Sequence, residues 1–376
     1  MDALLVIALQ GALIAILVWG SGGVPKGAWN DEPLSLAQSK SLQGLLALGV
    51  VFHHCAQKIY FDWSRPQDSF CGLEVMAFIG FAFVGYFFFC SGYGLCKSCQ
   101  KKQDYLDDFP KRRILPLVLT YYVCNTAYLV GRLVAGESFD APRLVRLALG
   151  VELANPNSWF VVTLPVLYLL FYLSKRGCTD EAQVTRRLFL GTGAYVLVGI
   201  GMALANLNGG YVLFLGKWWY NTAFLFPLGY LFGCKESEAW AWMKRGYRWQ
   251  VVCSIVLFTC CFLLSIHFGT FVPVIPLAMV LELLAAVFFT WGLLLFSLRR
   301  KVTSQVLAFY GGLTLELYLA HGFFVNLFHE PFYDKGMGIV NVGVSALYIL
   351  LVLACATPLA SLWYRAQRAQ KAAKRA

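Results

Sequence analysis

The sequence predicts an all-α polytopic membrane protein with about eleven transmembrane helices. Of its 376 residues, 59% are hydrophobic and only 14% are charged, and the mean hydropathy is +0.63. A soluble protein of this length would carry nearer a quarter charged residues. The apolar residues also gather in runs of membrane-spanning length, which short polar loops separate. These loops are too short to fold as a second domain.

Eleven apolar runs account for the predicted spans. They are residues 3–19, 42–60, 72–96, 114–135, 159–174, 188–207, 220–234, 250–268, 274–298, 306–328 and 339–362. The first run has the length of a signal peptide, but no basic residue precedes it, and we interpret it as a retained span. Pro227 and Pro276 lie inside two of the runs and predict kinks in those helices.

The loops between these runs carry unequal charge. Twenty-four Lys and Arg residues fall in alternate loops that include residues 97–113, and five fall in the opposite loops. By the positive-inside rule, this bias predicts a protein of the cytoplasmic membrane with an external N-terminus and a cytoplasmic C-terminus. The net charge of +11 is dispersed in these short loops, so we predict contact with membrane lipid and no nucleic-acid partner.

The twelve cysteines are scattered, mostly within apolar runs. Cys96 and Cys99 form a single C-x-x-C pair, with no second pair and no histidine at zinc-binding spacing. We therefore predict no metal site and no disulfide framework.

Ionisable residues inside the predicted spans are candidates for function, because they are costly in a bilayer. They are His53, His54, Glu74, Glu282, Glu316 and His321. His54 follows Gln43 by eleven residues, which places both on one helix face roughly 16 Å apart. His53 points about 100° away and is expected to support the helix. His54 and His321 both fall in the outer half of the membrane, where contact between them is possible.

Two further segments each allow two interpretations. In FFFCSGYGL (87–95), Ser91 and Gly92 mark either an unwound helix end that admits a ligand or a small-residue packing face. In FPKRRILPLVL (109–119), three cations lie beside a predicted span. They either anchor the chain by the positive-inside rule or bind phosphate, since arginine forks match phosphate oxygens.

Together these segments resemble the integral-membrane acyltransferases of the acyltransferase-3 type. The matching pieces follow the family order and are QGLLALGVVFHH, FFFCSGYGL, KRRILP, NSWFVVTLPVLYLLFYL, KWWYNTAFLFPLG and LELYLAHGFF. In the first piece, His54 stands at the family's histidine, while Gln43 replaces the usual arginine or lysine. Lys40 is the nearest basic residue that could supply the positive charge that Gln43 lacks. Pro110 stands at the first arginine of the third piece, and the span 3–19 is additional to the usual ten.

The resemblance implies an O-acyltransferase that moves an acyl group, typically acetyl, from cytoplasmic acyl-CoA to a hydroxyl of a cell-envelope glycan, another carbohydrate or a small molecule. His54 would act as general base, and His321 and Glu316 are the other catalytic candidates. The acyl-CoA co-substrate would be bound by Arg112, Arg113, Lys111, Gln43, Ser91 and Trp159. The family-like membrane domain would cover residues 40–362, between an N-terminal span with its linker (1–39) and a basic cytoplasmic tail (363–376).

Two other classes of function fit part of the sequence. A proton-coupled transporter or exporter would use the histidines and glutamates as a relay. The sequence lacks the paired halves with interrupted helices that many transporters have. A catalytically inactive acyltransferase-like scaffold is the other alternative, and Gln43 is the residue that keeps it open.

Overall fold

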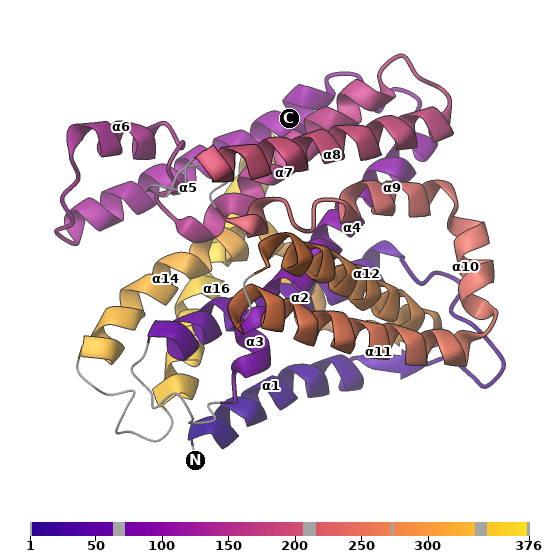
Figure 1. Cartoon of the computed structure of the whole chain (residues 1–376), viewed down its shortest axis with the longest axis horizontal. Helices are drawn as coiled ribbons and strands as arrows, with labels where there is room; N and C mark the ends of the chain where they lie inside the picture. The colour runs from indigo at the N-terminus through magenta and orange to yellow at the C-terminus, as the bar shows by residue number, and fades with distance from the viewer. Residues whose placement is uncertain (1, 63–71, 206–215, 272–273, 335–343, 374–376) are drawn as a thin grey trace. The chain divides into compact units, whose positions relative to one another are not determined.

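The computed structural model describes residues 2–62, 72–205, 216–271, 274–334 and 344–373 (Figure 1). These residues are helical over most of their length, which confirms an all-α fold of several apolar helices. The chain divides into two compact units. The first comprises Met1–Phe83 and Leu293–Ala376, and the second comprises Val84–Gly292.

The first unit is built from the two ends of the chain, coloured from indigo to purple and from orange to yellow in Figure 1. Its helices are α1 (Asp2–Trp19), α2 (Leu36–Gln57), α3 (Glu74–Phe78), α13 (Gln305–Gly312), α14 (Thr314–Asp334) and α16 (Val344–Ala373). A π-helical turn, Lys58–Asp62, continues α2. The described part of this unit also contains a small sheet that was not predicted from the sequence, in which β1 (Ser21–Gly23) pairs antiparallel with β2 (Arg300–Val302).

Helix α2 is the centre of the first unit, since it packs against α13, α14 and α16. It begins where the Ser35 hydroxyl accepts a hydrogen bond from the Gln38 backbone N–H, a standard N-cap. Gly44 allows α13 to approach, because a Cβ there would collide with the backbone carbonyl of Leu307. Helices α14 and α16 are also joined to each other, because the Tyr348 hydroxyl of α16 donates to the Val325 carbonyl of α14, at 2.7 Å.

A buried amide pair ties the linker before α2 to the rest of this unit. Asn30 Nδ2 donates to Gln38 Oε1 (3.0 Å) and to the Ser297 carbonyl (2.9 Å), and Gln38 Nε2 donates to the Arg300 carbonyl (3.0 Å). These bonds satisfy backbone carbonyls at the end of α12 and the start of β2. The start of α2 is thereby fixed.

The second unit contains the middle of the chain. Its helices are α4 (Gly80–Lys101), α5 (Leu115–Val134), α6 (Ala141–Ala148), α7 (Trp159–Lys175), α8 (Glu181–Ala205), α9 (Leu225–Cys234), α10 (Glu236–Lys244), α11 (Tyr247–Ile266) and α12 (Ile275–Arg299). Short turns precede three of them, at Pro110–Ile114, Pro156–Ser158 and Lys217–Trp219, and the turn His267–Phe271 follows α11. The first residues of α4 and the last of α12 belong to the first unit.

Close helix contact in the second unit depends on glycine. A Cβ at Gly92 in α4 would collide with the Phe226 carbonyl of α9, and a Cβ at Gly229 in α9 would collide with the Phe89 carbonyl of α4. Helix α4 is continuous through this contact. The segment 87–95 is therefore a small-residue packing face, and the alternative of an unwound helix end is wrong.

Five described helices are long and apolar enough to cross a membrane. They are Pro110–Val134, Pro156–Lys175, Tyr247–Thr270, Ile275–Arg299 and Val344–Ala369. Ala3–Trp19 and Leu225–Cys234 are shorter apolar helices. The chain is thus a multi-pass membrane protein, while the count of eleven spans stays a prediction. The predicted span 306–328 is not one helix: it divides between α13 and α14, where the pair Gly311–Gly312 weakens helix propagation.

Candidate active site

The last turn of α2 carries the histidine pair and places the two rings differently. His53 and His54 are both half-buried, and their ring centroids lie 4.9 Å apart with planes inclined by 53°. Consecutive residues on a helix differ by about 100° in direction, so the two rings meet different neighbours.

His53 is held by the segment that follows α2. Its Nδ1 lies 2.7 Å from the Met76 carbonyl in α3, and a carbonyl only accepts, so Nδ1 carries the proton. Its ring also fills the space beside Gly80, where a Cβ would collide with the imidazole. His53 thus anchors α3 and the start of α4 against α2.

His54 instead stacks on His321 of α14. The ring centroids lie 5.1 Å apart and the planes are inclined by 23°. His54 Nδ1 also lies 3.2 Å from Gln57 Oε1, one turn further along α2. With the Gln57 oxygen as acceptor, the proton of a neutral His54 lies on Nδ1, and Nε2 keeps its lone pair. The structure therefore brings together two of the three predicted catalytic residues.

His321 lies behind His54 and is fully buried. Its Nδ1 donates to the Leu317 carbonyl at 2.9 Å, one turn earlier in α14. Its Nε2 is buried and has no hydrogen-bond partner in the described part of the chain. The ring of Tyr318 approaches the His321 ring edge-on, with centroids 5.8 Å apart. A buried base with an unused lone pair is costly unless it acts on a ligand, a water or a proton.

The other predicted residues of the first unit lie earlier in the same two helices. Glu316 is buried in the first turn of α14, five residues before His321 and so on a different side of that helix. Gln43 is half-buried in α2, and the helical rise places it about 16 Å from His54.

Lys40, the nearest substitute for the missing basic residue, has a structural contact. Its Nζ donates to the Gly311 carbonyl at 2.8 Å. Gly311 is near the end of α13, where carbonyls lack helical partners, and a cation is favourable there.

In the second unit, the three predicted phosphate-binding cations are held by their own loop. Arg112 donates to the backbone carbonyls of Asp104 (3.4 Å) and Asp107. Lys111 is exposed and lies 3.7 Å from Asp108. Arg113 lies over the ring of Tyr105, 5.6 Å from its centroid.

Two predicted ligand-binding residues share a neighbour that the sequence did not indicate. The hydroxyl of Ser91 in α4 is hydrogen-bonded to Tyr168 of α7, and the charge of Arg113 also acts on Tyr168. Tyr168 contacts the ring of Phe109, with centroids 6.1 Å apart. Ser91 and Arg113 thus belong to one local environment. The tyrosine was missed because an isolated tyrosine in an apolar span gives no distinctive pattern.

Trp159 belongs to a separate aromatic cluster at the start of α7. It is 7% exposed, and its ring centroid lies 6.5 Å from those of both Phe88 and Trp219. This environment is apolar and can pack against a chain or ring of a ligand. Within the described ranges, no group of three or more His, Cys, Asp or Glu residues is arranged to hold a metal ion.

Comparison with known proteins adds one result. The sequence profile of the acyltransferase-3 family, described as an acyltransferase domain, matches residues 38–361. This range includes α2 from residue 38 onward and all of α14, and therefore both stacked histidines. No curated protein and no solved structure matches the chain.

Proposed function

Because the chain belongs to the acyltransferase-3 family, a family of acyltransferases, we propose that it is a membrane O-acyltransferase. Its donor would be acyl-CoA, with acetyl as the acyl group, bound from the cytoplasm. Its acceptor would be a hydroxyl of a cell-envelope glycan or related molecule. The chain would lie in the cytoplasmic membrane with its N-terminus outside and its C-terminus in the cytoplasm.

The observation that carries this proposal is the stack of His54 on His321, inside the region that matches the family. In the proposed step, His54 Nε2 takes the proton of the acceptor hydroxyl as the oxygen attacks the thioester carbonyl. The carbon–sulfur bond then breaks, and the leaving thiolate receives the proton as CoA thiol. General-base help of this kind contributes about 10²–10⁴ to a rate.

His321 would act through His54. Because it is fully buried, it reaches the acceptor less readily than the half-buried His54, and its ring fixes the orientation of the His54 ring. We also include Glu316, the buried carboxyl of α14, among the groups whose removal lowers turnover.

Several side chains are proposed to bind acyl-CoA. The phosphates would bind near Arg113, with Lys111 and Arg112 adding positive potential. Ser91 and Trp159 would contact the donor within the second unit. Gln43 would hydrogen-bond an amide or carbonyl of the donor, in place of the charge that other family members have there.

The test uses purified protein in liposomes, acetyl-CoA with a labelled acetyl group, and an envelope extract from cells that lack the protein. Mass spectrometry of the glycans and lipids identifies any base-labile ester. We expect label transfer by the wild type and at least a hundredfold loss in His54→Gln. His267→Gln, a histidine outside the stack, is the matched control and should keep full activity.

Three results would overturn parts of the proposal. Full activity of a correctly inserted His54→Gln protein would exclude His54 as the base. Acetyl-CoA binding without ester formation on any acceptor would support the inactive scaffold. Substrate-driven proton flux without acetyl-CoA would support a transporter.

A further inference from the structure

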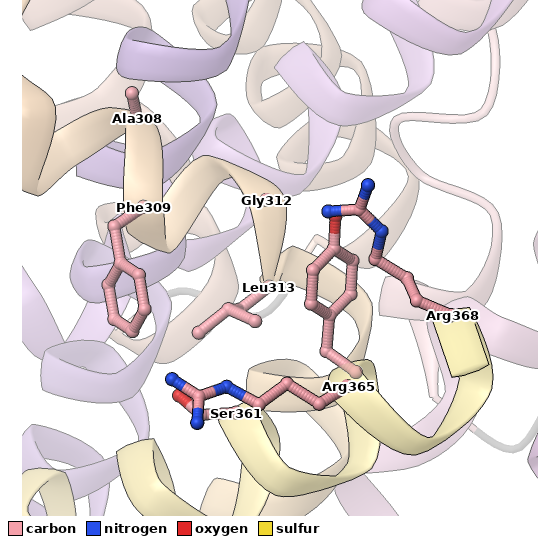
Figure 2. Close-up of a pocket in the computed structure, with 8 residues that line it drawn as sticks. Ala308, Phe309, Gly312, Leu313, Ser361, Arg365 and Arg368 are labelled. Atoms are coloured by element: carbon pink, nitrogen blue, oxygen red, sulfur yellow. The ribbon is translucent and has the colours of Figure 1, made fainter.

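A cavity of about 400 Å³ lies between α13 and the basic end of α16, within the first unit (Figure 2). Figure 2 shows residues of α13 on one side and the two arginines of α16 on the other. The lining residues are Ala308, Phe309, Gly312, Leu313, Ser361, Tyr364, Arg365 and Arg368. The proposed acyl transfer assigns no role to any of them.

The wall formed by α16 is strongly basic. Arg365 and Arg368 are three residues apart, so both side chains emerge on one side of the helix. The Arg368 guanidinium lies over the Tyr364 ring, 5.6 Å from its centroid, which fixes its position. None of the described residues that line the cavity is acidic. Neither arginine forms an ion pair with any part of the chain that the structure describes.

The wall formed by α13 is mostly apolar and leaves room for a ligand. Phe309 and Leu313 supply apolar surface, and a Cβ at Gly312 would meet no heavy atom within 4 Å. Gly312 and Leu313 also precede the first turn of α14 directly. The negative end of the α13 dipole and the positive end of the α14 dipole therefore both border the cavity, so its preference for an anion comes from the two arginines.

We propose that this cavity binds an amphiphilic phosphate ester, with its phosphate on Arg365 and Arg368 and its apolar part against Phe309 and Leu313. Planar guanidinium groups match phosphate oxygens in pairs, and a ring or chain fits the opposite wall. Two sources share this chemistry: the headgroup of an acidic phospholipid, and the phosphates of a soluble nucleotide. Basic pockets between membrane helices bind acidic headgroups. The binding does not depend on acyl transfer.

Binding measurements on the full-length protein in a neutral detergent test this assignment. The probes are dioctanoyl phosphatidylglycerol, the zwitterionic dioctanoyl phosphatidylcholine, and adenosine 3′,5′-bisphosphate, and thermophoresis gives each dissociation constant. We expect the double variant Arg365→Gln/Arg368→Gln to bind the preferred probe at least about tenfold more weakly. The control Lys101→Gln/Lys102→Gln removes the same charge from two exposed positions, the last residue of α4 and the residue after it, and should bind as the wild type does.

A second variant fills the cavity and keeps its charge. Gly312→Leu places a side chain in open space and should also block binding, whereas Gly201→Leu, at an equally open glycine of α8, should not. Binding of phosphatidylglycerol but not of the bisphosphate assigns a lipid, and the reverse assigns a nucleotide. Equal binding of phosphatidylcholine, or binding that neither variant weakens, would overturn the proposal. Because no turnover is measured, failure here leaves the acyltransferase proposal separately testable.

Discussion

Lys40 Nζ donates a hydrogen bond to the carbonyl oxygen of Gly311, at 2.8 Å, and so joins the start of α2 to the last turn of α13. The backbones of the two helices also approach closely here, because a Cβ on Gly311 would collide with the Lys40 backbone. The ammonium lies where helix carbonyls lack partners and where the helix dipole is negative. Lys40 therefore stabilises a helix junction.

Replacement of Lys40 by methionine should destabilise this junction. Methionine keeps most of the side-chain volume but leaves the Gly311 carbonyl without this donor. We expect a loss of about 1.5–3 kcal/mol in unfolding free energy, the range for hydrogen bonds to charged groups. Denaturant unfolding in detergent measures it. Lys26→Met, at an exposed lysine of the preceding linker, should have little effect. Equal stability of the two variants would contradict the junction role.

Gly44→Ala should be destabilising even though alanine favours helices. The new methyl group would collide with the Leu307 carbonyl and force α2 and α13 apart. Overpacking of this kind costs about 1–3 kcal/mol. Gly11→Ala in α1 is the matched control, because a Cβ there meets no heavy atom within 4 Å. The control should be neutral or slightly stabilising. Thermal unfolding of both variants decides the question.

His321→Asn should lower turnover and leave the KM for acetyl-CoA nearly unchanged. The substitution removes the ring on which His54 stacks, and a base misplaced by about 1 Å can cost roughly a hundredfold in rate. His321→Phe keeps a stacked ring and should recover part of the lost kcat if the role is positioning. Steady-state kinetics separate the two effects. A KM change alone in His321→Asn would contradict the assignment.

Acid should weaken the second unit through Glu236 at the start of α10. Burial raises the pKa of this carboxyl, but hydrogen bonds from Lys97 (2.8 Å), Tyr93 (2.8 Å) and Trp240 (3.3 Å) outweigh burial and hold the pKa below its usual range. A carboxyl whose pKa is lowered by folding stabilises the protein when the pH is above its pKa in the unfolded chain, about 4.3. This stabilisation is lost as the pH falls through the pKa of the carboxyl in the folded protein.

The variant Glu236→Gln tests this titration. It should be less stable than the wild type at pH 7 by about 1–2 kcal/mol. The difference should shrink as the pH falls below about 4, because the wild-type carboxyl then becomes neutral. Melting temperatures of the wild type and of Glu236→Gln across this pH range measure the difference. Glu238→Gln, which changes an exposed carboxyl of the same helix, is the control. A stability difference that does not change with pH would contradict the prediction.

The sequence located the histidines and allowed a contact between His54 and His321, but it could not show that the contact forms. The ten-residue gap between Gln43 and His54 is visible in the chain, and helical geometry places both on one face. The stack of His54 on His321 depends on how α14 packs against α2, which no local pattern contains. Likewise, nothing in the sequence showed that Tyr168 would link Ser91 with Arg113.

The helix boundaries show the same limit. Hydropathy predicted a single span at 306–328, because every residue around Gly311–Gly312 is compatible with a bilayer. The division into α13 and α14 follows from the low helix propensity of two glycines and from the collision that any Cβ at Gly311 would cause. Glycine pairs inside apolar runs were the available signal, and hydropathy does not register them.

The two contacts of α2 also set its rotational register. Lys40 contacts α13, and His54 contacts α14. The two residues are fourteen positions apart in α2, which corresponds to about 21 Å along the helix. A single residue inserted between them would leave the first contact in place and turn the imidazole of His54 by about 100°, out of the stack. The distance between a lysine and a histidine, counted in residues, thus determines which way the proposed base faces.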